Sequence, residues 1–143
     1  MKTEVVQKAV LISPKGKMLL LRRSASDERR PKQWDLVGGL LEEGESYETG
    51  IKREILEESG LEAKSRSLVF AKTEASEWQQ DGLKKSASTI RLYYVARVAE
   101  TKVTLSFEHD DFLWASIEEA LNLLEYPRHK AVLQYIIDNS IEL

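Results

Sequence analysis

Three glutamates, Glu54, Glu57 and Glu58, stand at relative positions i, i+3 and i+4 of a segment rich in glycine and glutamate. In a helix this spacing places all three side chains on one face within about one turn. Like charges at helical spacing repel one another, so the face is either solvated or holds a positive ion. Carboxylate oxygens are the ligands that Mg²⁺ and Mn²⁺ prefer, and these ions serve phosphoryl chemistry. The pattern therefore indicates a divalent-metal site, with a solvated acidic surface as the alternative.

Local signals around these glutamates predict a helix over residues 47–59. Ser46 is a suitable N-cap, and Gly60 stands where a glycine commonly ends a helix. Ile51 and Ile55 form an apolar stripe beside the acidic face. The helix can therefore pack on a sheet while its carboxylates line the edge of the contact.

Gly50 lies inside the predicted helix, one turn before Glu54. A glycine in a helix costs about 1 kcal/mol relative to alanine. We expect the absent side chain to leave space beside Glu54 and Glu57. On that hypothesis an alanine is tolerated at this position and a leucine obstructs the acidic face.

The remaining elements predict a mixed α/β protein, since several strands surround this early helix. Residues 76–87 are expected to form a loop, and residues 102–106 a further short strand. Two helices follow, the first capped by Ser116 with Glu119 and the second with Pro127 in its first turn. The expected strands cover residues 4–12, 18–22, 34–38, 67–75, 88–98 and 112–115, and the two later helices cover residues 117–124 and 128–138.

The composition limits the class of protein. The 143 residues have the length of one domain, carry a net charge of −3 and include no cysteine. A negative net charge argues against a stable nucleic-acid partner, which needs a basic surface, and the missing cysteines exclude thiolate metal sites. No apolar run approaches the ~18 residues of a membrane span, and the N-terminus is too polar for a signal peptide. We expect a cytoplasmic protein with one domain, residues 1–143, and no membrane partner.

The acidic segment resembles the box of the Nudix hydrolase family, written G-x5-E-x7-R-E-U-x-E-E-x-G-U with U apolar. Every fixed position is matched, by Gly39, Glu45, Arg53, Glu54, Ile55, Glu57, Glu58, Gly60 and Leu61. The lead-in "WDLVGG" is similar to the family's W-[DE]-x-P-G-G, with Val37 in place of the proline. The resemblance implies the Nudix fold, an α/β/α sandwich whose mixed central sheet is flanked by helices, with the box at residues 39–61.

The same resemblance implies an activity and a set of roles. Nudix hydrolases cleave a nucleoside diphosphate linked to another moiety, by attack of water on phosphorus with Mg²⁺, for which Mn²⁺ can substitute. Carried over by position, Glu57 and Glu58 are metal ligands, Glu54 is a ligand or the general base, and the carbonyl of Gly39 is a further ligand. The implied structural residues of the box are Glu45, Arg53 and Gly60.

Three residues outside the box are candidates for the site. Arg23 belongs to an Arg-Arg pair similar to one in MutT-like members, and it is expected to contact substrate phosphates. Trp34 either stacks on a nucleobase or packs in the core. Glu108, six residues before Trp114, is similar in position to a glutamate of MutT-like members and is expected to complete the metal site, with His109 as an orienting neighbour; a solvated acidic loop is the alternative.

The sequence leaves the substrate and the function class partly open. Signatures similar to those of ADP-ribose, NADH and diadenosine polyphosphate hydrolases are absent, which favours a nucleoside triphosphate or an oxidised nucleotide. A nucleotide sugar or dinucleoside polyphosphate remains an alternative, as does a non-catalytic nucleotide-binding module. We expect a small-molecule nucleotide as the partner and a monomer or homodimer as the assembly. His129 is expected at the surface.

Overall fold

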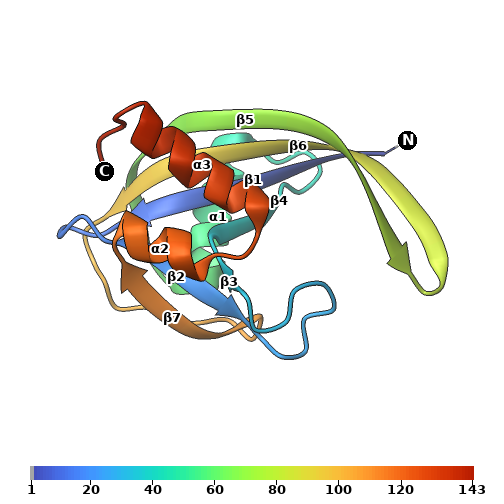
Figure 1. Ribbon diagram of the computed structural model, residues 1–143, viewed down its shortest axis with the longest axis horizontal. Helices are drawn as coiled ribbons and strands as arrows, with labels where there is room; N and C mark the ends of the chain where they lie inside the picture. Colours follow the sequence, from blue (N-terminus) through green and yellow to red (C-terminus); the bar gives the residue numbers. More distant parts are fainter. Residues whose placement is uncertain (1) are drawn as a thin grey trace.

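The computed structural model describes residues 2–143 as one mixed sheet with helices on both faces (Figure 1). In chain order the elements are β1 (Lys2–Ile12), β2 (Met18–Arg23), β3 (Trp34–Asp35), β4 (Val37–Leu40), α1 (Tyr47–Ser59), β5 (Ala63–Gln80), β6 (Leu83–Val98), β7 (His109–Ala115), α2 (Ile117–Leu123) and α3 (Pro127–Asp138). Among these residues no helix is both long and apolar enough to cross a membrane.

The sheet has the strand order β3-β2-β1-β6-β5, with β4 paired to β1 and β7 paired to β2. β1 and β6 run parallel, and the other pairs are antiparallel. α1 covers one face, while α2 and α3 cover the other (Figure 1). The predicted α/β/α arrangement around a mixed sheet is confirmed.

β1 explains why both faces of the sheet are covered. Val10 and Ile12 belong to the apolar cluster beneath α2 and α3, whereas Ala9 and Leu11 belong to the cluster beneath α1. Successive side chains of a strand point to opposite faces, so an uninterrupted apolar run needs packing on both sides. All four side chains are fully buried. The sheet is therefore the middle layer of the molecule.

α1 begins and ends at the predicted residues. The side chain of Ser46 accepts a hydrogen bond from the backbone N–H of Thr49, which satisfies one free donor of the first turn. Gly60 takes the left-handed conformation, with φ of 73°, and closes the helix as a glycine does without steric cost. Ile51 and Ile55 are fully buried against the sheet, so the predicted apolar stripe is confirmed.

The two later helices also follow their local signals. The capping box of Ser116 and Glu119 is complete, with both hydrogen bonds formed. α2 ends one residue before its predicted limit, and Pro127 opens α3 as its first residue. A capping box for α2 and a first-turn proline for α3 were therefore sufficient to place both helices.

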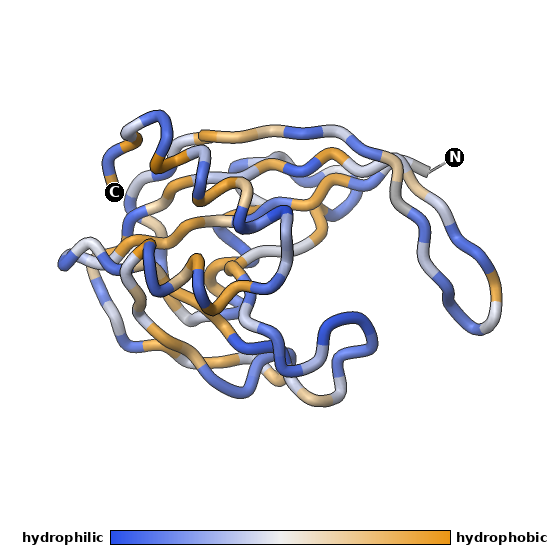
Figure 2. The backbone as a smooth tube through the Cα atoms, in the orientation of Figure 1, coloured by the Kyte–Doolittle hydropathy of each residue, from blue (hydrophilic) through white to orange (hydrophobic). Residues whose placement is uncertain are grey.

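Two strand predictions were wrong. Residues 76–87 do not form a loop, because β5 and β6 continue through them as a long antiparallel arm that reaches beyond the rest of the sheet (Figure 1). The arm reverses at Asp81 and Gly82, both with positive φ, which matches the twist of a two-residue hairpin. Figure 2 shows that the end of the arm is mostly hydrophilic, which explains why its polarity suggested a loop. Residues 102–106 form no strand.

His129 is fully buried, so its predicted surface position was wrong. Its Nε2 lies 2.6 Å from Oδ1 of the buried Asp35, and its Nδ1 lies 3.1 Å from the hydroxyl of Tyr93. The carboxylate can only accept, so Nε2 carries the proton and the Tyr93 hydroxyl donates to Nδ1. Burial lowers the pKa of His129 to about 4, although Asp35 acts in the opposite direction. The imidazole is therefore neutral at neutral pH.

This burial predicts a pH-dependent stability. In the unfolded chain the His129 imidazole takes up a proton near pH 6.5, whereas in the folded protein it stays neutral down to about pH 4. The unfolded state thus binds the extra proton between these values, and stability falls as the pH falls. Between about pH 7 and pH 5, His129 should account for a loss of about 2 kcal/mol.

The measurement is urea unfolding of the wild-type protein and the His129→Gln variant at both pH values. Glutamine can donate to Asp35 and accept from Tyr93, but it has no proton to gain in this range. All other titrating groups are shared, so the variant should lose less stability on acidification. An equal loss in both proteins would contradict the assignment.

Candidate active site

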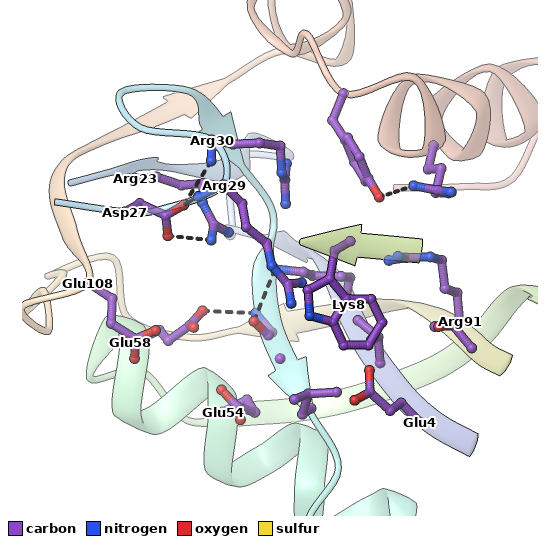
Figure 3. Close-up of a pocket in the computed structure, with 18 of the residues that line it drawn as sticks. Glu4, Lys8, Arg23, Asp27, Arg29, Arg30, Glu54, Glu58, Arg91 and Glu108 are labelled. Atoms are coloured by element: carbon purple, nitrogen blue, oxygen red, sulfur yellow. Dashed lines mark hydrogen bonds and ion pairs between the residues drawn. The ribbon is translucent and has the colours of Figure 1, made fainter. Parts of the chain in front are cut away.

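One cavity of about 820 Å³ brings the acidic face of α1 together with loops and strands far away in the sequence. Glu54, Glu58 and Glu108 lie toward one end of it (Figure 3). Glu4 and Arg91 lie toward the other end (Figure 3). The cavity therefore extends from the predicted metal site to the part of β1 and β6 that leads into the β5–β6 arm.

The lining carries both signs of charge. α1 contributes Glu54, Glu57 and Glu58. Elements outside the box contribute five arginines, which are Arg23, Arg29, Arg30, Arg91 and Arg128. A pocket of this kind can hold cations at one side and phosphate oxygens at the other.

Glu58 is the buried member of the acidic face, with 5% of its surface exposed. Its Oε1 accepts a hydrogen bond of 2.9 Å from the backbone N–H of Gly38. Burial raises the pKa of Glu58 to about 8, against the opposing effects of Lys8 and the Gly38 N–H. Burial also raises the pKa of Glu54, against the opposing effect of Arg53. Both carboxyl groups thus lack sufficient positive charge from the protein itself.

Arg53 joins the box loop to α1. Its Nε and Nη2 donate to the two oxygens of Glu45, at 2.6 and 3.0 Å, in a bidentate pair. Its Nη1 donates to Glu54 and Glu57, at 3.0 and 3.2 Å. One guanidinium therefore fixes the loop and partly neutralises the exposed side of the acidic face. These contacts are those that the predicted structural roles of Glu45 and Arg53 require.

The expected clearance at Gly50 was wrong. A side chain there would meet Cδ1 of Leu41 at 2.4 Å, Oε1 of Gln7 at 2.7 Å and Oε1 of Glu45 at 2.9 Å, not the carboxylates of the acidic face. The glycine allows the box loop and β1 to approach α1 closely. An alanine is therefore not accommodated without movement of these side chains.

The glycine pair before the box is shaped by its neighbours. Gly38 has a φ of 136°, and a side chain there would lie 2.0 Å from the backbone oxygen of Gln7, so only glycine fits. At Gly39 a side chain would lie 3.0 Å from the carboxyl group of Glu54. The missing side chain at Gly39 keeps open the space beside that carboxyl group.

Sequence reasoning missed a buried charge cluster behind this glycine pair. Asp35 is fully buried, and its Oδ2 lies 2.6 Å from Arg23, 3.3 Å from Lys8 and 3.6 Å from Arg30. Burial alone would raise the pKa of Asp35, but Lys8, the hydrogen bond from His129 and Arg30 hold it well below its ordinary value. The signals available in the sequence were an aspartate inside the predicted strand of residues 34–38 and its match to the acidic position of the W-[DE]-x-P-G-G lead-in.

Lys8 connects this cluster to the glycine pair. Besides Asp35, its ammonium group donates to the carbonyls of Leu36 and Gly38, at 3.1 and 3.0 Å. The Gly38 N–H in turn holds Glu58. The buried charges therefore fix the backbone that positions a carboxylate of the acidic face.

The candidates outside the box differ in position. Arg23 lines the cavity but is paired with Asp27 at 2.5 Å and with Asp35. Trp34 is half-buried, packs against the cluster beneath α2 and α3, and is not part of the cavity lining. Glu108 lines the cavity from the turn before β7. The structure thus brings Arg23 and Glu108 to the box carboxylates, and it leaves Trp34 outside.

The acidic stretch around Glu108 divides into two parts. His109 begins β7, lines the cavity and is buried, which lowers its pKa to about 4. Its Nδ1 has no hydrogen-bond partner within residues 2–143. Asp110 instead pairs with Arg22 and Lys32, and neither it nor Asp111 is part of the cavity lining. Only the first part can act in the cavity.

The oxygen donors at the cavity fit a hard divalent cation, although they are not yet arranged around one point. In the part of the chain that the structure covers, no three acidic or histidine side chains converge as a ready-made metal centre. Arg53 draws Glu54 and Glu57 toward itself. The fit rests on oxygen donors at the cavity, on the space kept open at Gly39, and on the raised pKa of Glu58, which a nearby cation would compensate.

Comparison with known proteins agrees with this geometry. The NUDIX domain family model matches residues 2–136. The nucleoside triphosphatase NudI of Klebsiella pneumoniae subsp. pneumoniae is 32% identical over 115 residues, covering 78% of this chain and 81% of that protein. The NudI of Escherichia fergusonii is 30% identical over 112 residues, covering 76% and 79%.

Solved structures share the fold. A MutT protein from Methanosarcina mazei Go1 has a TM-score of 0.74 at 24% identity, over 99% of this chain and 97% of that one. The NUDIX domain of Shewanella oneidensis NrtR, solved with ADP ribose, has a TM-score of 0.78 at 17% identity, over 98% and 90%. The chain belongs to the NUDIX family, and it is a pyrophosphohydrolase of nucleoside diphosphate derivatives. Hydrolases of this family generally need a divalent metal ion, usually Mg²⁺.

The position of Lys8 predicts a large stability effect. Lys8→Met should lower the free energy of unfolding by about 3 kcal/mol, because breaking a buried ion pair leaves an uncompensated charge and two carbonyls lose their donor. Lys17→Met is the matched control, since Lys17 forms an exposed pair with Glu119 at 4.0 Å and should cost less than about 1 kcal/mol. Urea unfolding measures both. Similar small losses would show that the buried cluster does not depend on Lys8.

Proposed function

We propose that this enzyme hydrolyses a nucleoside triphosphate or an oxidised nucleotide, with Mg²⁺ as its metal and Mn²⁺ as a possible substitute. The observation that carries the proposal is one cavity in which the α1 carboxylates face arginines from other elements. A triphosphate needs both, since its oxygens must be neutralised and held. The two relatives described above, at 32% and 30% identity, are named nucleoside triphosphatases, which supports the same substrate class.

The proposed metal site uses oxygen donors from three elements. Glu57 and Glu58 of α1 are its carboxylate ligands, the Gly39 carbonyl is a ligand from β4, and Glu108 completes it from the turn before β7. Glu54 is either a further ligand or the general base. When bound, Mg²⁺ supplies charge neutralisation and a lower pKa for the attacking water.

The protein's own groups prepare this site. Because the pKa of Glu58 is raised to about 8, its carboxyl group holds a proton near neutral pH unless a cation is present. The Gly38 N–H fixes one of its oxygens at 2.9 Å. Arg23 is proposed to contact substrate phosphates, although Asp27 and Asp35 already neutralise much of its charge. Other arginines of the cavity lining must therefore also supply positive charge to the phosphates.

The proposal extends to the setting of the enzyme. Its partner is a small-molecule nucleotide, it works as a monomer or homodimer in the cytoplasm, and no nucleic acid is a stable partner. A nucleotide sugar or a dinucleoside polyphosphate is the alternative substrate, and a non-catalytic nucleotide-binding module is the alternative class. All carboxylates of the box are present, which supports catalysis over binding alone.

The test is a panel of nucleotides incubated with the protein and Mg²⁺, including nucleoside triphosphates, oxidised nucleotides, nucleotide sugars and dinucleoside polyphosphates. Products are identified by mass spectrometry after reaction in ¹⁸O-water, which also shows the phosphorus that water attacks. Turnover of triphosphates or oxidised nucleotides above the other classes is the expected result. Turnover of another class alone would replace the proposed substrate, and no turnover would favour the binding module.

Glu57→Gln and Glu58→Gln should each lower turnover by at least about 100-fold, because loss of second-shell partners of a metal already costs about 10- to 100-fold. Glutamine keeps the size of the side chain and can still accept the Gly38 N–H, so the fold should be retained. Glu62→Gln is the matched control, since Glu62 is exposed just beyond the helix and lies outside the cavity. Near-normal turnover of either α1 variant at saturating Mg²⁺ would defeat the ligand assignment.

Glu108→Gln should lower activity by roughly 10-fold and raise the Mg²⁺ concentration needed for half-maximal rate. Asp110→Asn and Asp111→Asn should change both quantities much less, because neither side chain is part of the cavity lining. Magnesium titrations of the initial rate separate these cases. Equal and small effects of all three substitutions would remove Glu108 from the metal site.

A further inference from the structure

Trp78 is a large aromatic residue in an unexpected place. It lies on β5 near the end of the arm, opposite Lys85, in a region that is mostly hydrophilic (Figure 2). Yet its side chain is half-buried and lines the cavity that holds the α1 carboxylates. The arm therefore brings one apolar ring to the cavity and places polar residues around it.

Arg29 holds this ring at the cavity. Its guanidinium lies 5.4 Å from the centre of the indole, a cation–π contact between the loop before β3 and the arm. The other five arginines of the cavity lining are each paired with a carboxylate: Arg23 and Arg30 with Asp35, Arg91 and Arg128 with Glu74, and Arg53 with Glu45. Within the described part of the chain Arg29 has no such pair. Its charge remains available to an anionic ligand.

Glu4 supplies a polar group to the same cavity. It lines the cavity and is half-buried, and its carboxyl group forms no hydrogen bond or ion pair with any residue that the structure describes. Figure 3 places it beside Arg91, away from Glu58 and Glu108. A carboxylate in this position can accept hydrogen bonds from a ligand.

The length of β1 gives the distance between the two ends of the cavity. Glu4, Val6 and Lys8 alternate along the strand, so all three side chains project to one face, and all three line the cavity. At about 3.3 Å per residue, Glu4 stands about 13 Å from Lys8, whose ammonium group holds the backbone beside Glu58. An elongated ligand can therefore have one end at the carboxylates of α1 and its other end at Glu4, with Trp78 lining the same cavity.

We propose that Trp78 and Glu4 form a nucleobase subsite, in which the indole stacks on the face of the base and Glu4 accepts a hydrogen bond from a ring N–H or an exocyclic amine. The inference rests on the proposed function, because a base reaches Glu4 only when its phosphates lie at the carboxylates of α1. A planar ring with N–H donors at its edge matches both groups. Arg29 closes the subsite and contacts the phosphate chain or the sugar side of the ligand.

The test compares binding with and without a base. Wild-type protein and variants are titrated calorimetrically, with Mg²⁺ present, with non-hydrolysable α,β-methylene nucleoside triphosphates of each common base and with inorganic tripolyphosphate. Trp78→Ala should raise the Kd of the nucleotide analogues roughly 5- to 100-fold, the range of lost base–aromatic stacking. The Kd of tripolyphosphate should stay within about twofold, since tripolyphosphate has nothing to stack.

Three further variants separate stacking from a structural role. Trp78→Phe keeps an aromatic face and should retain most of the affinity, while Glu4→Ala should weaken the nucleotide analogues and leave tripolyphosphate unchanged. Leu83→Ala is the matched control, because it trims an exposed apolar side chain from the same arm outside the cavity. Its affinities should equal those of the wild type.

Each failure has a distinct meaning. If Trp78→Ala weakens tripolyphosphate as much as the nucleotides, the ring only supports the cavity, and the subsite is overturned. If it weakens neither, or if the wild type prefers no nucleotide over tripolyphosphate, there is no base subsite, although hydrolysis of phosphate anhydrides stands. If the wild type binds neither ligand, the proposed function fails, and the subsite fails with it.

Discussion

The buried carboxylate of Asp35 is the constraint on which the rest of the site depends. An isolated charge cannot be buried without large cost, so the fold must bring opposite charges and hydrogen-bond donors to it. It does so with Lys8 from β1, Arg23 from β2 and His129 from α3. A central strand, its neighbour and the C-terminal helix are thereby fixed relative to one another. Because burial disfavours a charged imidazole, with a smaller contribution in the same direction from Lys8 and Arg30, His129 contributes a neutral hydrogen bond instead of another charge.

This constraint reaches the acidic helix through the backbone. Lys8 is paired with Asp35, and its ammonium group also donates to the carbonyl of Gly38. The N–H of Gly38 in turn donates to Glu58. Arg53 secures the opposite, exposed side of the same helix face. The carboxylates are therefore positioned by the protein but not fully neutralised by it, since burial raises the pKa of Glu58 far above its ordinary value. A site in this condition is suited to bind a cation, because the remaining stabilisation must come from a ligand.

The sequence predicted those parts of the structure that depend on neighbouring residues. The limits of α1 followed from Ser46 and Gly60, and the acidic face followed from helical spacing alone. The arm was missed because local polarity was taken as a loop, although an Asp-Gly pair between strand-like segments is a hairpin signal. The pairing of Asp35 with His129 joins residues 94 positions apart, and no local pattern reports such a contact. Burial of a polar side chain is decided by tertiary packing, which composition and periodicity do not contain.

The same distinction explains why the chemistry of this enzyme is easier to infer than its substrate. The acidic end of the cavity comes from one contiguous segment, in which spacing and residue type are sufficient to predict an acidic face suited to a divalent cation. The rest of the lining includes Glu4, Arg29 and Trp78, which belong to the first strand, a loop and the arm. Glu4 and Trp78 line one cavity because β6 runs beside β1 and extends into the hairpin with β5. On the proposed function, substrate selection can thus change with single residues on the arm or loop while the acidic face and the fold stay the same.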